Sequence, residues 1–110
     1  MENSRYKFRA WSNVEMSTSD EYDSMADFWL DCNYCKIMQY TGLKDKNGNP
    51  IYEGDILKGI NGVIGQVIFN DGAFLFSVDM MPLVDFTNYS NTEKWAEIIG
   101  NIYENPELLK

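Results

Sequence analysis

The sequence has no histidine among its 110 residues. Histidine is the most frequent general base and metal ligand in proteins, so its absence excludes serine–histidine and cysteine–histidine catalysis and any histidine-bound zinc. Positive charge is scarce as well: 9 Lys+Arg oppose 17 Asp+Glu, which gives a formal net charge of −8. Because proteins that follow a phosphate backbone normally carry basic surface, this charge argues against a nucleic-acid partner.

Long apolar runs are also missing. No run approaches the roughly 18 residues that a membrane helix needs. The polar opening Met1–Arg5 is followed by no apolar signal segment. We therefore expect a cytoplasmic protein without a membrane partner.

Only two cysteines occur, too few for the disulfide framework of a secreted protein. The spacing of Cys32 and Cys35 fits half of a zinc site or a redox pair. A structural zinc needs four ligands, and the chain has no other Cys and no His. Zinc would therefore require two chains sharing a site, or carboxylate ligands. We interpret the pair as structural thiols, with a redox or metal role as the alternative.

Alternating residue types predict a β-rich fold. Residues 5–10 alternate basic and apolar, which predicts a strand with Arg5, Lys7 and Arg9 on its outward face. Apolar segments and turn formers, Asn47-Gly48 above all, predict further strands at intervals of about ten residues. We expect them at 14–16, 36–40, 51–52, 56–58, 63–69, 73–78 and 94–102. The pattern indicates a mainly β fold, a small barrel or roll with one contiguous core.

Helical signals are few. The segment between Ala10 and Cys35 contains six acidic residues and no basic one. Its apolar residues recur at helical spacing, and Thr18 with Glu21 resembles a capping box, which predicts a helix over 20–31. Asn105-Pro106 predicts a second short helix near the C-terminus. We expect at most one or two short helices.

One pattern partly matches a cation site. Asp45, Asn47 and Asn49 alternate as in the first half of a calcium-binding loop. Pro50 and Ile56 stand where that loop needs glycine and a bidentate glutamate. We therefore predict a solvated hairpin turn.

The remaining patterns favour structural roles. The bases of the first strand could bind phosphate, but we interpret them as protecting a sheet edge or pairing with the acidic segment. Gly59, Gly62 and Gly65 fit turns and a strand bend, not a phosphate-binding loop. Met80–Leu83 is the expected exposed apolar loop, either a partner contact or tucked onto the end of the barrel. The sequence thus offers no catalytic, cofactor-binding or metal-binding residue.

Four segments resemble the signature of a known family: Tyr6–Trp11 (YKFRAW), Met38–Gly48 (MQYTGLKDKNG), Ile51–Ile56 (IYEGDI) and Ile99–Leu109 (IGNIYENPELL). They are similar to the YopX family of small phage and prophage proteins. The resemblance implies a β-rich fold with an SH3-like barrel, an origin on a bacterial mobile element, and no established activity. It also implies extended structure for residues 20–31, as an alternative to the helix.

The resemblance implies a single domain over residues 1–110. Residues 1–35 would form the N-terminal strand and an acidic variable segment, and residues 36–110 the β-barrel core. Our first hypothesis for function is a non-enzymatic protein-binding module whose acidic surface engages a host or phage protein. A nucleic-acid-binding small barrel is the alternative, and a carboxylate-based enzyme comes third.

Overall fold

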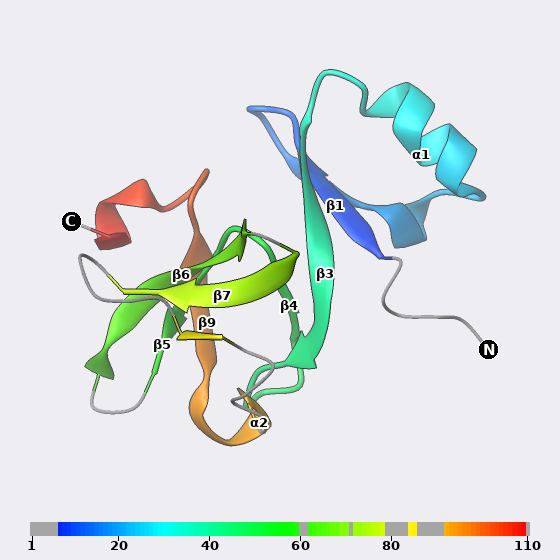
Figure 1. The fold of residues 1–110 in the computed structure, drawn as a ribbon. Helices are drawn as coiled ribbons and strands as arrows, with labels where there is room; N and C mark the ends of the chain where they lie inside the picture. Colours follow the sequence, from blue (N-terminus) through cyan, green and yellow to red (C-terminus); the bar gives the residue numbers. More distant parts are fainter. Residues whose placement is uncertain (1–6, 60–61, 71, 79–83, 86–91, 110) are drawn as a thin grey trace.

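The computed structural model describes residues 7–59, 62–70, 72–78, 84–85 and 92–109. In this part of the chain the strands form two antiparallel sheets, so the predicted mainly β class is confirmed (Figure 1). The two α-helices, α1 (Met25–Asp31) and α2 (Thr92–Trp95), are short, as expected. The strands are β1 (Phe8–Trp11), β2 (Met16–Thr18), β3 (Lys36–Lys44), β4 (Pro50–Tyr52), β5 (Asp55–Lys58), β6 (Ile64–Asn70), β7 (Ala73–Ser77), β8 (Val84–Asp85) and β9 (Glu97–Asn101).

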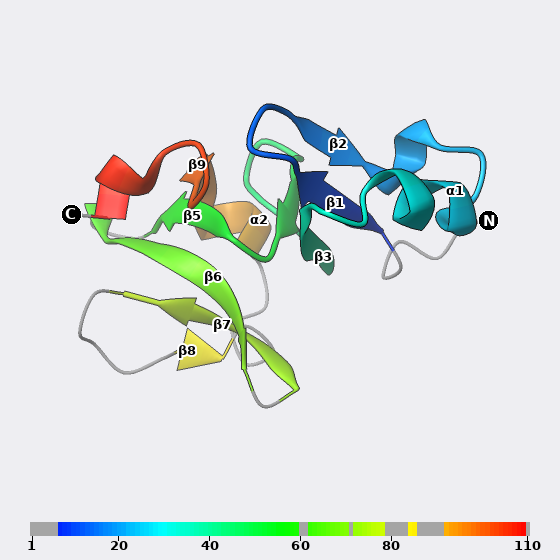
Figure 2. The same cartoon turned by 90° about the horizontal axis from the view of Figure 1, so that it is seen from above.

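The first sheet has the strand order β2-β1-β3-β4. Strand β1 lies inside it, with Ala10 opposite Ser17 of β2 on one side and opposite Ile37 of β3 on the other. Strand β3 extends to Lys44, beyond its predicted end, because its second half pairs with β4 across the predicted Asn47-Gly48 turn. Helix α1 packs on this sheet at the end of the molecule away from the second sheet (Figure 2).

The second sheet has the order β8-β7-β6-β5-β9. The predicted meander β5-β6-β7 is confirmed, with Leu57 opposite Gly65 and Val67 opposite Phe76. Strand β9 pairs with the free side of β5. The finer expectation of an SH3-like barrel stays a prediction.

The chain passes from the first sheet to the second through a tight turn at Gly54. Its φ of +91° is the positive value that glycine tolerates without strain. The Gly54 N–H donates to the Val67 carbonyl at 2.8 Å, and the Gly54 carbonyl accepts from the Ile102 N–H at 2.9 Å. This one residue therefore joins β4, β6 and the segment after β9.

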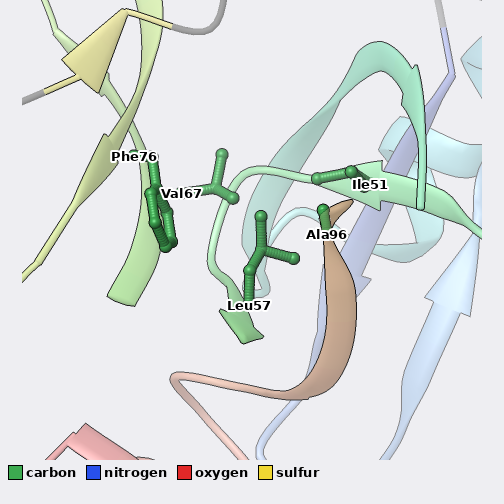
Figure 3. Close-up of a cluster of buried hydrophobic side chains, with 5 residues drawn as sticks. All are labelled: Ile51, Leu57, Val67, Phe76 and Ala96. Carbon is green, nitrogen blue, oxygen red and sulfur yellow. The ribbon is translucent and has the colours of Figure 1, made fainter. Parts of the chain in front are cut away.

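Buried apolar side chains form two clusters in the described residues, not the single contiguous core that was predicted. One cluster lies between β1 and α1 and contains Ala10, Phe28 and Cys32. The other lies between β4 of the first sheet and the second sheet (Figure 3) and contains Ile51, Leu57, Val67, Phe76 and Ala96. The core is divided because the acidic segment folds back on the first sheet and buries its apolar residues there.

The predicted helix over 20–31 begins later than expected. The N-cap is Ser24, whose Oγ accepts from the Asp27 N–H at 3.1 Å, whereas Thr18 makes no side-chain cap. Residues Ser19–Glu21 form a separate 3-10 turn. The capping-box assignment was therefore wrong, although the predicted C-terminal end of the helix is confirmed at Asp31.

The predicted last strand, 94–102, is also too long. Its first residues belong to α2, and β9 begins at Glu97. The helix forms there because Thr92 Oγ1 donates to the Lys44 carbonyl at 2.8 Å and the Trp95 ring packs 5.7 Å from that of Phe76. Pro106–Leu109 forms a 3-10 helix at the predicted position.

Candidate functional site

Arg9, expected on an outward face, is buried at the joint between the two sheets. Its Nη2 lies 2.7 Å from Oδ1 of Asp55, and its guanidinium lies 4.7 Å from the centre of the Tyr52 ring. The prediction was wrong because Asp55, in the second sheet, supplies a carboxylate that makes burial of the arginine tolerable. Since β1 has neighbours on both sides, its bases protect no sheet edge either.

Asp55 is a buried carboxylate with both oxygens engaged. Oδ1 pairs with Arg9, and Oδ2 accepts the Tyr52 N–H at 2.8 Å. Burial raises the pKa of Asp55, while Arg9 and the Tyr52 amide oppose that rise. A general acid or base must exchange its proton with a substrate. Here the carboxylate instead connects β1, β4 and β5.

The predicted hairpin turn at Asp45 is confirmed. The prediction that its side chain is solvated was wrong, because Asp45 is only 1% exposed. Its Oδ1 accepts from the N–H groups of Asn47 at 3.0 Å and Asn49 at 2.8 Å. Its Oδ2 accepts from the Ile98 N–H of β9 at 3.1 Å. The side chain that began the calcium-like pattern thus clamps the turn to the second sheet.

The basic residues of the first strand have partners of their own where they are described. Lys7 Nζ lies 3.2 Å from Oδ2 of Asp20 and 5.5 Å from the centre of the Tyr40 ring. The predicted pairing with the acidic segment is confirmed for Lys7. Arg5 lies outside the described residues.

Cys32 and Cys35 are free thiols at the C-terminal end of α1. Cys32 is buried in the cluster with Phe28, and the Cys35 N–H donates to the Cys32 carbonyl at 3.0 Å. The pKa of the Cys35 thiol is raised, mainly by burial and to a smaller extent by the neighbouring Cys32. A thiol held protonated at neutral pH is a poor nucleophile and metal ligand. This setting supports the interpretation as structural thiols.

Tyr22 packs beside these thiols. Its hydroxyl donates to Oδ2 of Asp31 at 2.5 Å and lies 3.8 Å from the Cys32 sulfur. The hydrogen bond to Asp31 is the main cause that raises the pKa of Tyr22. In the part of the chain that the structure describes, no group of three or more Cys, Asp or Glu side chains could hold a metal ion.

The acidic lobe, residues 15–31, retains exposed charge. All six of its acidic side chains are exposed. Asp20 pairs with Lys7, and Asp31 accepts from Tyr22. The other four make no ion pair with any residue that the structure describes; they are Glu15, Glu21, Asp23 and Asp27.

The same lobe also exposes large apolar side chains. We define the α1 patch as Trp29, Leu30 and Tyr34, whose exposed fractions are 40%, 75% and 92%. Two residues along a helix turn a side chain by about 200°, so Leu30 points away from the side on which Phe28 is buried. Exposed aliphatic and aromatic side chains in a segment whose acids are mostly unpaired among the described residues make this face the candidate functional site.

Two other features bear on partners. The expected apolar loop Met80–Leu83 lies outside the described residues. No helix in the described part of the chain is long and apolar enough to cross a membrane.

Sequence reasoning missed the buried roles of Arg9, Asp45 and Asp55. For Asp55 a signal was present: it lies between the apolar pairs Ile51-Tyr52 and Ile56-Leu57. A charged residue between buried apolar residues is normally paired, so this pattern indicates a buried cationic partner, which we did not predict. The identity of that cation depended on a contact distant in sequence.

The two curled sheets define a small, mainly β protein with a two-part core, and comparison with known proteins specifies it further. Residues 8–110 match the family described as YopX protein. This chain therefore belongs to the YopX family. The crystal structure of protein EF1440 from Enterococcus faecalis is similar, with a TM-score of 0.60 and 25% identity over 94% of this chain and 97% of that one. Among curated proteins none matches the chain.

Proposed function

We propose that this chain is a non-enzymatic protein-binding module, encoded by a phage or prophage, whose acidic lobe binds a basic surface of a host or phage protein. The observation that carries the proposal is the set of four exposed acids that lack an ion-pair partner among the described residues. Uncompensated charge of one sign steers an oppositely charged partner and favours its binding.

The pairing of the other ionisable groups favours a protein-binding module over a nucleic-acid-binding barrel and over a carboxylate-based enzyme. Arg9 is buried against Asp55 and Lys7 is paired with Asp20, so the first strand presents little cationic surface to a phosphate backbone. The buried carboxylates of Asp45 and Asp55 are engaged by main-chain N–H groups or by Arg9. That engagement argues against carboxylate catalysis.

The experiment compares two variants of equal net charge. Asp23→Asn/Asp27→Asn neutralises two of the six acids of the acidic lobe, and the control Glu93→Gln/Glu107→Gln neutralises two exposed acids elsewhere. Wild type and both variants are immobilised, and proteins captured from a bacterial lysate are eluted by raising salt from about 0.1 M to about 1 M, which shortens the Debye length from about 10 Å to about 3 Å. Each captured protein is then purified and titrated against the three chains.

The proposal predicts a basic protein that binds wild type and control alike, that binds the lobe variant at least about tenfold more weakly, and that salt releases. Equal binding to all three chains would contradict it. A parallel titration with single- and double-stranded DNA at low salt is expected to show no binding; binding there would support the nucleic-acid alternative instead.

A further inference from the structure

We infer that the α1 patch is the contact surface of this module and that it takes an amphipathic basic helix of a partner protein. The inference rests on the proposed function and adds to it where the partner sits and what shape it has. Leu30 is 75% exposed and Tyr34 is 92% exposed, although both could have been polar at no cost to the core. Their exposure leaves an apolar surface next to the acids of the lobe.

The patch has a rigid edge. The Trp29 ring lies 5.4 Å from that of Phe8 and 5.3 Å from that of Phe28, which fixes its orientation. A side chain that is already ordered loses little conformational entropy on binding, so it is well suited to anchor a partner. Leu30, the next residue on α1, and Tyr34, in the turn after the helix, add exposed apolar surface within five residues of that anchor.

The surrounding charge selects the occupant. Asp27 is exposed one helical turn before Leu30 on α1, Asp23 is exposed just before the helix, and no basic residue occurs between Ala10 and Cys35. A second copy of this chain would bring a net charge of −8 against the same acids. Nucleic acid and anionic membranes carry charge of the same sign and would be repelled as well. A protein segment with apolar residues flanked by lysine or arginine would pack on the apolar patch and pair with the acids of the lobe.

The form of the patch favours a helical segment. Ala26 and Leu30 are both exposed and lie four residues apart on α1, which makes a short ridge along the helix. Such ridges pack into the grooves of another helix. The seven residues of α1 span about 10 Å, which matches roughly two turns of a partner helix.

The test uses two synthetic peptides of identical lysine, leucine and alanine composition. One places leucine at helical spacing on a single face, and the other distributes leucine around the helix. Both are titrated by calorimetry against wild type, Leu30→Ser/Tyr34→Ser, and the control Val14→Ser/Val63→Ser, which removes two exposed apolar residues outside the patch. Thermal unfolding of each chain checks that the variants are folded.

The inference predicts that wild type and control bind the amphipathic peptide at least about tenfold more tightly than the scrambled one, and that the patch variant loses this preference. Amide chemical shifts of wild type should change most within residues 26–34. Equal affinity of wild type for both peptides, a preference retained by the patch variant, or shifts centred on the second sheet would each overturn the inference.

The lobe variant Asp23→Asn/Asp27→Asn separates the two proposals. If this variant binds both peptides more weakly than wild type does, while wild type binds the two peptides with equal affinity, charge-driven binding by the lobe stands and the α1 patch inference falls. If neither the lobe variant nor the patch variant binds more weakly than wild type, the proposed function and this inference fail together.

Discussion

Replacing Arg9 with methionine tests whether the joint between the two sheets depends on the buried ion pair. At the 2.7 Å separation of Nη2 and Asp55 Oδ1, an effective dielectric constant of about 20 gives roughly 6 kcal/mol of gross attraction. Desolvation of both groups offsets part of it. Removing one partner strands the other charge in the interior, so we expect Arg9→Met to cost about 3–5 kcal/mol.

Urea unfolding followed by tryptophan fluorescence measures this loss. With an m-value of about 1.5 kcal/mol/M, the midpoint should fall by roughly 2–3 M. Asp55→Asn is the second arm, and the double variant closes a thermodynamic cycle. We expect the double variant to be at least about 2 kcal/mol more stable than the sum of the two single losses implies. If each single variant loses less than about 1 kcal/mol of unfolding free energy and the double variant loses the sum of the two, the ion pair does not hold the joint together.

The pH dependence of the same variant is a further check. Because burial raises the pKa of Asp55 above its ordinary value of 3.8, the folded chain binds this proton more tightly than the unfolded chain does. Protonation of Asp55 therefore stabilises the folded chain fully below the unfolded-state pKa of 3.8, and this stabilisation is lost as pH rises through the higher pKa of the folded state. Without Arg9 the pKa rises further, so Arg9→Met should cost more stability at about pH 7 than at about pH 4. An equal cost at both pH values would contradict this.

Four more predictions concern Gly54, Asp45, calcium and Cys35. Gly54→Val should lower stability by about 3 kcal/mol in thermal unfolding, because φ is +91° and a Cβ would lie 3.0 Å from Met38 Sδ. The control Gly48→Val, with φ +82° and open space around it, should cost only about 1 kcal/mol. An unchanged melting temperature for Gly54→Val would disprove the strain. Asp45→Ala should cost at least about 3 kcal/mol because three N–H groups lose their acceptor. Calcium should leave the melting temperature of wild type unchanged, and a calcium-dependent rise would show an ion site at the Asp45 turn, contrary to our prediction. Cys35 should be alkylated by iodoacetamide more slowly than a cysteine in a short peptide at neutral pH, and faster as pH rises, because burial raises its pKa; a rate equal to that of the peptide would contradict this.

Local signals in the sequence were sufficient for the turns and for most strands. The positive φ at Gly48, Gly54 and Gly72 follows from steric freedom that glycine carries in any context. Alternation placed β1, and apolar segments between turn formers placed β6 and β7, each to within one or two residues where they are described. These features depend on neighbours in the chain, which a sequence displays directly.

The errors arose where distant residues decide the outcome. Arg9 looked like a surface base because the carboxylate of Asp55 reaches it only after the second sheet folds against the first. Residues 94–95 were predicted as the start of a strand because the helix there depends on a hydrogen bond from Thr92 to the distant Lys44. The α1 patch carried no sequence signal, because the helical periodicity of Trp29 resembled that of a core residue.

We propose that Arg9, Asp45 and Asp55 hold the fold together and that the face of the acidic lobe binds the partner protein. Amide hydrogen exchange of the wild-type chain, alone and with a basic protein captured by it, measures this separation directly. The account predicts added protection within α1 and the turn that follows it, residues 25–35, with little change in β4 and β5. Protection centred on β4 and β5, with α1 exchanging as in the free chain, would contradict it.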